Sequence, residues 1–216
     1  MTLSLAYAED EDAAVSAEDR VRIHAVPRAI DPDAAEVAAL ALLRALGIDP
    51  DDPGNPDLAR TPKRFAAAYA ELLSPQPFDF TTFANTDGYD ELVLVRDIPV
   101  HSVCEHHLLP FSGVAHVAYL PADRVVGLSK IPRMVDHFSR RPQTQERLTV
   151  QVADALALRL QPRGVGVVIE ATHSCMTLRG ARAGGAATKT SALRGVLRDD
   201  ARSRAEFLAL VTERRA

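Results

Sequence analysis

Apolar and polar residues alternate along residues 91–103, "ELVLVRDIPVHSV", as they do in a strand with one buried face. A second strand is predicted at 113–121, "GVAHVAYLP". Two more are predicted nearer the C-terminus, a long one at 164–179, "GVGVVIEATHSCMTLR", and one at 188–197, "TKTSALRGVL". The predicted strands therefore fall into two pairs, separated by a long intervening segment.

Two helices are predicted before the first strand. Asp31 can cap free amides, Pro32 suits the first helical position, and apolar residues then keep helical spacing up to Gly47, a typical C-terminal glycine. Thr61 and Pro62 repeat this cap-and-proline arrangement and begin the second helix. Together these helices would form an N-terminal helical section.

Three more helices are predicted at 129–140, 142–161 and 199–214. The first two lie between the strand pairs, and the third closes the chain. Paired strands with paired helices between them predict an α+β fold, in which an antiparallel sheet carries helices on one face.

The same pattern divides the chain into three parts. Residues 1–30 are polar, acidic and aperiodic, which predicts a poorly ordered tail. Residues 31–89 would be the helical section, and 90–216 the domain that contains the sheet.

Composition narrows the class of protein. The chain has 216 residues, 47% of them hydrophobic, which is enough for a packed core. It has no run of eighteen apolar residues, so no membrane span is expected, and its acidic start does not resemble a signal peptide, so we expect a cytoplasmic protein.

The charge is unevenly distributed. The first 60 residues carry 13 acidic against 5 basic residues, and the remainder carries 16 against 20. A body this mildly basic does not predict nucleic-acid binding, and it suits a small anionic ligand better, although a solvated mixture of charges is the simpler alternative.

The candidate chemistry begins at Cys104 and His107, which are three residues apart and could face one metal ion from a tight turn. The only other cysteine, Cys175, is the obvious third donor. Three protein donors with a fourth position left for water are the pattern of catalytic zinc. The alternative is a pair of buried free thiols beside surface histidines.

Two histidines next to these donors are candidates for proton transfer. His106 adjoins His107. His173 precedes Cys175 by two residues, so on a strand His173 and Cys175 would face the same pocket. Imidazoles beside a zinc-activated water suit a hydrolysis with several proton transfers, although His106 could equally orient a ligand. The remaining histidines are expected to be structural: His24, His101, His116 and His137.

An anion site is predicted where Ser129, Lys130 and Arg133 surround a helix start, because free amides and the helix dipole favour a phosphate there. Arg179 could bring a further guanidinium towards the same pocket. The alternative is a solvated basic face.

Glu146 lies near the start of an amphipathic helix. A carboxylate facing a pocket can accept hydrogen bonds from the N1–H and the exocyclic amine of guanine. In isolation, a surface glutamate beside Arg147 is the simpler interpretation.

Several stretches, in this order and at consistent spacing, resemble the GTP cyclohydrolase I family. The matching stretches are "SVCEHHLLPFSGVAHVAYLP", "GLSKIPRMV", "RRPQTQERLTVQVADAL", "THSCMTLRG", "TKTS" and "EFL". The resemblance runs from about Thr61 to Leu210, and the first 60 residues share only a helix with the family.

The resemblance implies roles for individual residues. The zinc ligands would be Cys104, His107 and Cys175. The acid–base pair would be His106 and His173, and Glu146, helped by Gln145, would hold the guanine. The triphosphate would be held, or the later rearrangement assisted, by Ser129, Lys130, Arg133 and Arg179, and Arg64 would add a contact from a neighbouring subunit.

It also implies a reaction and an assembly. Water would add to GTP at C8, the ring would open and lose formate, and the ribose would rearrange to give 7,8-dihydroneopterin triphosphate, the first step of folate and pterin biosynthesis. The family has the tunnelling fold and forms homo-oligomers, typically a decamer of two pentamers with active sites between subunits.

Two features depart from the family pattern, the Gly184–Gly185 loop and the acidic N-terminal tail. The rival functions are a non-catalytic zinc-stabilised purine-binding scaffold and another pterin or deazaguanine enzyme of the tunnelling fold. A scaffold would need a closed metal site, but it would not need His106 or His173. The related nitrile reductase would need a nucleophilic cysteine and would not need this set of metal donors.

Overall fold

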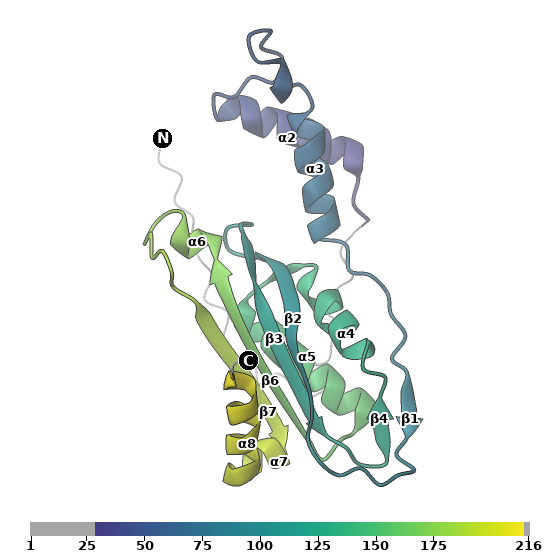
Figure 1. Ribbon diagram of the computed structural model, residues 1–216. Coiled ribbons are helices and arrows are strands. Elements are labelled where there is room, and N and C mark those ends of the chain that lie inside the picture. The colour runs from purple at the N-terminus through teal and green to yellow at the C-terminus, as the bar shows by residue number, and fades with distance from the viewer. Residues whose placement is uncertain (1–28, 214–216) are drawn as a thin grey trace, which may run out of the picture.

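A computed structural model describes residues 29–213 of the chain. The predicted acidic tail therefore lies, but for its last two residues, outside the described residues. Within them the chain folds into a helical section and a larger body built on one curled sheet (Figure 1). The elements follow in this order: α2 Pro32–Ala45, the 3-10 turn η1 Pro56–Leu58, α3 Thr61–Leu72, β1 Thr82–Ala84, β2 Val93–Cys104, β3 Pro110–Leu120, β4 Arg124–Val126, α4 Lys130–Ser139, β5 Pro142–Gln143, α5 Gln145–Leu160, β6 Gly164–His173, α6 Ser174–Thr177, β7 Thr188–Gly195, α7 Val196–Asp199 and α8 Ala201–Thr212.

The helical section consists of α2 and α3, which pack against each other. Its first predicted cap is confirmed, because Asp31 Oδ1 accepts a hydrogen bond of 3.0 Å from the Ala34 amide and Pro32 occupies the first helical turn. The second predicted cap is wrong. Thr61 is itself the first residue of α3, and the residue before it, Arg60, makes no side-chain capping bond.

The body is built on a five-stranded sheet in the order β5-β2-β3-β6-β7. The pairs β2–β3, β3–β6 and β6–β7 are antiparallel, and only the two-residue strand β5 runs parallel to its neighbour. The predicted α+β class and antiparallel sheet are confirmed, and the order of two strands, two helices and two strands is the one expected of the tunnelling fold.

Helices cover both faces of this sheet. Alternate residues of β6, including Val165, Val167 and Ile169, point into the main core that α4 and α5 complete. On the opposite face Val168 packs with Phe207 of α8 in a second, smaller core. The two helices on one face are therefore confirmed, and α8, for which no face was predicted, covers the other (Figure 1).

Close packing of α8 depends on Gly166. A Cβ atom at this position would lie 2.7 Å from the Phe207 ring, closer than real side-chain contacts allow. Glycine in the middle of β6 therefore lets the helix approach the sheet.

A bulge in β2 fastens the end of α8. The β2–β3 register shifts between Val95 and Ile98, and Asp97 takes a left-handed φ of 56°. Arg96 in the bulge donates hydrogen bonds to the carbonyl oxygens of Leu210, in the last turn of α8, and of Glu213, the residue that follows the helix. The bulge thus connects the N-terminal part of β2 to the last helix, α8.

Two further local features differ from the sequence prediction. The long strand 164–179 is wrong in its second half, because β6 ends at His173 and the chain turns into the short helix α6. The small strands β1, β4 and β5 were not predicted. In the unusual glycine loop, Gly185 has a φ of 84°, a conformation that glycine permits.

None of the helices between residues 29 and 213 combines the length and the apolar character needed to cross a bilayer.

Candidate metal centre and active site

The turn from β2 to β3 brings Cys104 and His107 together. The amides of His107 and Leu108 both donate to the Cys104 carbonyl oxygen, and Leu108 takes a φ of 53° to reverse the chain. As a result, Cys104 Sγ lies 3.8 Å from His107 Nδ1. Two donors that are close in sequence therefore face one point in space, as the spacing predicted.

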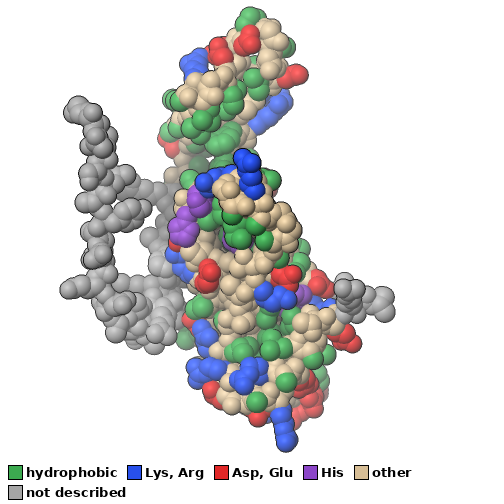
Figure 2. Space-filling view, turned by 90° about the vertical axis from the view of Figure 1, so that its left-hand side faces the viewer, with side chains coloured by type: hydrophobic (Ala, Val, Ile, Leu, Met, Phe, Trp, Pro, Cys, Tyr) green, Lys and Arg blue, Asp and Glu red, His purple; other side chains and the backbone are tan. Residues whose placement is uncertain are grey.

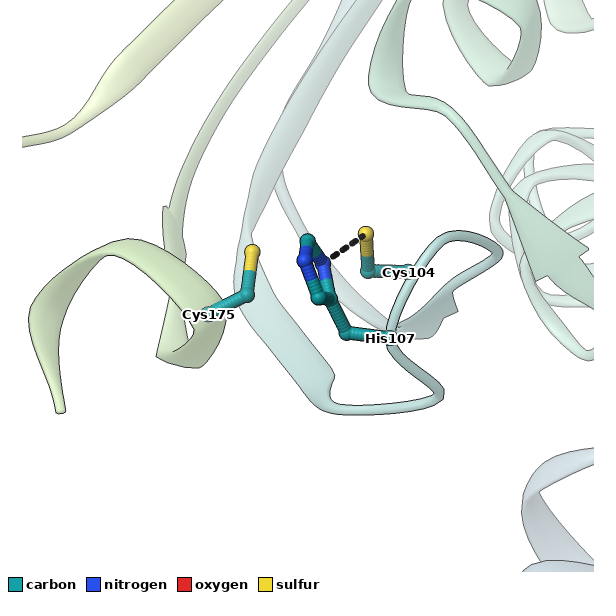
Figure 3. A group of neighbouring side chains, drawn as sticks. All are labelled: Cys104, His107 and Cys175. Carbon is teal, nitrogen blue, oxygen red and sulfur yellow. Dashed lines mark hydrogen bonds between the residues drawn. The ribbon is translucent and has the colours of Figure 1, made fainter. Parts of the chain in front are cut away.

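Cys175 reaches the same point from a different element. Because β6 pairs with β3 and His173 lies opposite Phe111, the end of β6 lies beside the β2–β3 turn. The next residues form the first turn of α6, which carries Cys175 (Figure 3). The ligand atoms of Cys104, His107 and Cys175 all lie within 4.8 Å of one another.

The donor set fits a zinc ion. Tetrahedral zinc with two thiolates and an imidazole places its donors about 3.5–3.8 Å apart, so the group needs only a small contraction around an ion. In the described part of the chain, no fourth His, Cys, Asp or Glu joins it. Burial and the nearby Cys104 thiol raise the pKa of Cys175, and a bound cation would offset both effects.

The group opens onto a cleft of about 210 Å³. The cleft is lined by Cys104, His106, His107, Gln143, Thr144, Gln145, Glu146, His173, Cys175, Met176 and Thr188. Figure 2 shows histidine and basic side chains side by side at the end of the body next to the helical section. The cleft leaves room for water or a substrate beside the three donors.

His173 is the last residue of β6 and is held from two sides. Its ring stacks on Phe111, with centroids 4.4 Å apart and planes 12° from parallel. Its Nε2 lies 2.8 Å from Gln145 Oε1. Burial lowers the pKa of His173, and the charge of Glu146 opposes that shift, so a mainly neutral imidazole faces the cleft at pH 7.

The start of α5 forms the opposite wall. Thr144 caps the helix by accepting from the Arg147 amide at 3.3 Å, which fixes the position of its first turn. In that turn Gln145 points inward and is 1% exposed, whereas Glu146 is exposed at the cleft.

His106 lies at the mouth of the cleft. Its side chain is 66% exposed, and its Nδ1 is 3.9 Å from Cys104 Sγ. The tight turn therefore keeps both imidazoles, those of His106 and His107, near the Cys104 sulfur.

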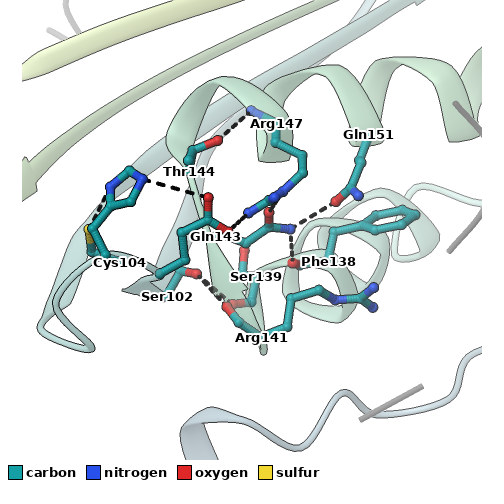
Figure 4. A network of polar contacts seen from close by, with 11 residues as sticks. Ser102, Cys104, Phe138, Ser139, Arg141, Gln143, Thr144, Arg147 and Gln151 are labelled. Carbon is teal, nitrogen blue, oxygen red and sulfur yellow. Dashed lines mark hydrogen bonds and ion pairs between the residues drawn. The ribbon is translucent and has the colours of Figure 1, made fainter. Parts of the chain in front are cut away.

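An ion pair that the sequence analysis missed anchors this turn. Glu105 pairs with Arg147, which also donates from Nε to Gln143 Oε1 at 2.9 Å (Figure 4). Gln143 in turn donates to Gln151 Oε1 and to the Phe138 carbonyl oxygen. The network connects the metal-binding turn to α4 and α5. In the sequence, the only clue to the ion pair is that Glu105 lies next to the metal donors.

The predicted anion-binding residues are mostly separate from the cleft within one chain. Ser129 precedes α4, whose far end contacts β2 through a 2.6 Å hydrogen bond from Ser102 Oγ to the Ser139 carbonyl oxygen. A ten-residue helix is about 15 Å long, so Ser129 and Lys130 lie roughly that distance from this contact. Arg133 lines another cavity, of about 290 Å³, with Phe78, Pro132 and Asp136 among its walls.

The other two predicted cations differ in their positions. Arg179 lies two residues after the end of α6, and its charge lowers the pKa of Cys175, so it lies near the donors. Arg64 is exposed on α3 and does not line the cleft. The helix that carries Arg64 reaches the metal-binding turn through Tyr69, whose hydroxyl donates to the Leu108 carbonyl oxygen at 2.9 Å.

Comparisons with known proteins identify the family of the chain. A family model described as GTP cyclohydrolase I matches residues 35–212. The chain is 53% identical over 193 residues to GTP cyclohydrolase 1 of Mycobacteroides abscessus, an alignment that covers 87% of this chain and 93% of that relative. It is 52% identical over 189 residues to GTP cyclohydrolase 1 of Mycobacterium tuberculosis, with 85% of this chain and 92% of the relative covered.

Proposed function

The chain belongs to the GTP cyclohydrolase I family, and we propose that it hydrolyses GTP to 7,8-dihydroneopterin triphosphate and formate, the first step of folate and pterin biosynthesis. One observation carries the proposal. The donors Cys104, His107 and Cys175 converge at a cleft that also contains His173 and Glu146.

We infer that Cys104, His107 and Cys175 hold a zinc ion. Two thiolates and an imidazole are a donor set that zinc favours, and three protein ligands leave a coordination position open. When bound, zinc would lower the pKa of a coordinated water to about 7 and so supply hydroxide at neutral pH. Because this site needs reduced thiols, a cytoplasmic location suits the enzyme.

The histidines would move the protons of the reaction. His173 is held rigidly beside the donors and would exchange a proton with the purine ring. His106 is exposed at the mouth of the cleft, where it would pass protons between the cleft and solvent.

Glu146 would recognise the base. Its carboxylate is exposed at the cleft, on the first turn of α5, where it can accept hydrogen bonds from the N1–H and the amino group of guanine. Adenine presents no such pair of donors at these positions, so this contact would select GTP over ATP.

The triphosphate would be bound by Ser129, Lys130, Arg133, Arg179 and Arg64, with Ser129 also assisting the later rearrangement. Since most of these lie away from the cleft of their own chain, we propose that another copy supplies them in a homo-oligomer, a decamer of two pentamers. Leu128 and Leu178, which neighbour these residues, are 62% and 77% exposed, as expected of surfaces covered by a partner. In the described residues β2 also has no strand partner on its outer edge before Val103, so its sheet can be extended by a second chain.

The rival scaffold function fits the site less well. A structural zinc site is closed by four protein ligands, whereas this group has three and faces a cleft. A scaffold also gives no reason for a histidine clamped between Phe111 and Gln145.

The direct test is to incubate the zinc-loaded protein with GTP, with and without a zinc chelator, and to measure formate and the fluorescence of oxidised neopterin. We expect both products, and we expect the chelator to abolish both. Formate without the pterin would indicate ring opening with a failed rearrangement, and would direct attention to Ser129. Neither product from a zinc-loaded, assembled protein would favour the scaffold.

A further inference from the structure

The Gln145 side chain is fully occupied inside the protein. Its Nε2 lies 3.0 Å from the Ile169 carbonyl oxygen, 2.9 Å from the Thr188 carbonyl oxygen and 3.0 Å from Thr190 Oγ1. Its Oε1 faces His173 Nε2 at 2.8 Å. Because the residue is only 1% exposed and its amide already has these partners, its side chain has little capacity left to bind a substrate.

These contacts fix which way the amide points. The carbonyl oxygens of Ile169 and Thr188 can only accept hydrogen bonds, so the atom that faces them must be the NH₂ group. The opposite atom, which faces His173, is therefore the oxygen Oε1.

The amide orientation in turn fixes the hydrogen on His173. An amide oxygen only accepts, so His173 Nε2 must carry a hydrogen and donate it to Gln145 Oε1. In the neutral imidazole the free lone pair then lies on Nδ1. Stacking on Phe111 fixes the plane of the same ring, so its tilt, its rotation and its tautomer are all determined by the protein.

We propose that Gln145 is a positioning residue for His173, which it holds as the Nε2–H tautomer so that Nδ1 is the atom that exchanges a proton with the substrate. This assignment replaces the guanine contact expected for Gln145 and leaves recognition of the base to Glu146. It rests on the proposed function, because it gives His173 the proton-transfer role in that reaction.

The test separates orientation of a catalytic group from recognition of the base. Gln145→Met removes the amide at similar length, and Glu146→Gln is the matched control one residue away. With GTP we expect Gln145→Met to lower kcat about 100-fold, the lower end of what general acid–base catalysis contributes, with KM changed less than about threefold. Glu146→Gln should instead raise KM about tenfold or more, the effect of losing a charged hydrogen-bond acceptor for the base.

A double variant adds a readout that a merely structural role would not produce. If Gln145 acts through His173, adding Gln145→Met to His173→Ala should lower kcat no further, because the two changes remove the same function. Additive losses, or a raised KM with kcat intact in Gln145→Met, would overturn the assignment.

Two controls separate other causes of failure. A wild-type protein that forms no formate or pterin would overturn the proposed function together with this inference, whereas active wild type with a KM effect in Gln145→Met overturns the inference alone. If Gln145→Met fails to fold or to bind zinc, Thr190→Val replaces it, since this change removes one partner of Nε2 on β7. A several-fold fall in kcat at constant KM would then support the assignment, and unchanged kcat would overturn it.

Discussion

The metal-binding end of the sheet and the start of α4 both carry predicted active-site residues, but only the residues at the sheet end converge within one chain. At the sheet end, the β2–β3 turn, α6 and the first turn of α5 meet because strand register places Phe111 opposite His173. At the start of α4, Ser129 and Lys130 lie about a helix length from that end. Under the proposed function, one chain would therefore build the catalytic half of the site, and the triphosphate half would depend on assembly.

The largest expected effect comes from removing a metal donor. Cys175→Ala should lose both bound zinc and detectable formate release, because the two remaining protein donors are too few to hold the ion. His173→Ala, two residues away, should keep one zinc per chain and lose about 10²–10⁴-fold in kcat, the usual contribution of an acid–base group. Metal analysis and a formate assay on both variants make the comparison.

Either variant can contradict the assignments. Stoichiometric zinc in Cys175→Ala would remove that residue from the ligand set. Normal formate release by His173→Ala would remove the histidine from the proton-transfer steps.

A mixing experiment tests whether the two halves come from different chains. Cys175→Ala lacks the catalytic half and Arg133→Ala lacks the triphosphate half, so each should be inactive or nearly so as a homo-oligomer. After unfolding and refolding together in equal amounts, about one quarter of the sites would pair two intact halves, if neighbouring chains assemble at random.

Two controls show whether any recovered activity comes from mixed oligomers. Mixing intact oligomers without subunit exchange should recover nothing, and so should refolding either variant alone. If the co-refolded oligomer regains no activity, then Arg133 acts within its own chain or not in the site.

Sequence patterns predicted the parts of the site that depend on local spacing. Cys104 and His107 are three residues apart, so a tight turn is enough to bring them together, and the Asp31 cap likewise depends only on neighbouring residues. The alternation of β2 and the helical spacing of α5 were also sufficient to place those elements.

What the patterns missed depends on distant contacts. The Glu105–Arg147 pair joins residues 42 positions apart, and the stacking of His173 on Phe111 exists only because of the β3–β6 register. The four residues of α6 are too few to show helical periodicity, so the end of β6 was extended past His173. The role of Gln145 could not be read from the sequence, since its hydrogen-bond partners lie on β6 and β7.

The smallest expected effect concerns His116, a histidine distant from the chemistry. Its side chain is 7% exposed on β3, and its Nδ1 accepts a 3.3 Å hydrogen bond from the Asp97 amide in the β2 bulge. Burial lowers the pKa of His116 below its usual 6.5, an effect that exceeds the opposing pull of Asp97. The folded state therefore binds fewer protons than the unfolded state, so stability is fully present above about pH 6.5 and falls as the pH drops towards the lowered value.

His116→Gln should reduce this acid sensitivity, because the glutamine Oε1 can accept from the same amide but does not titrate. We expect wild type to lose a few degrees more of its melting temperature than His116→Gln between about pH 7.5 and pH 5.5. All other histidines and the metal donors are shared by the two proteins, so their titration cancels in the difference. If the melting temperatures of the two proteins fell equally over this pH range, the bulge contact would tolerate a protonated His116. The acid sensitivity of the protein would then come from the metal-binding end of the sheet.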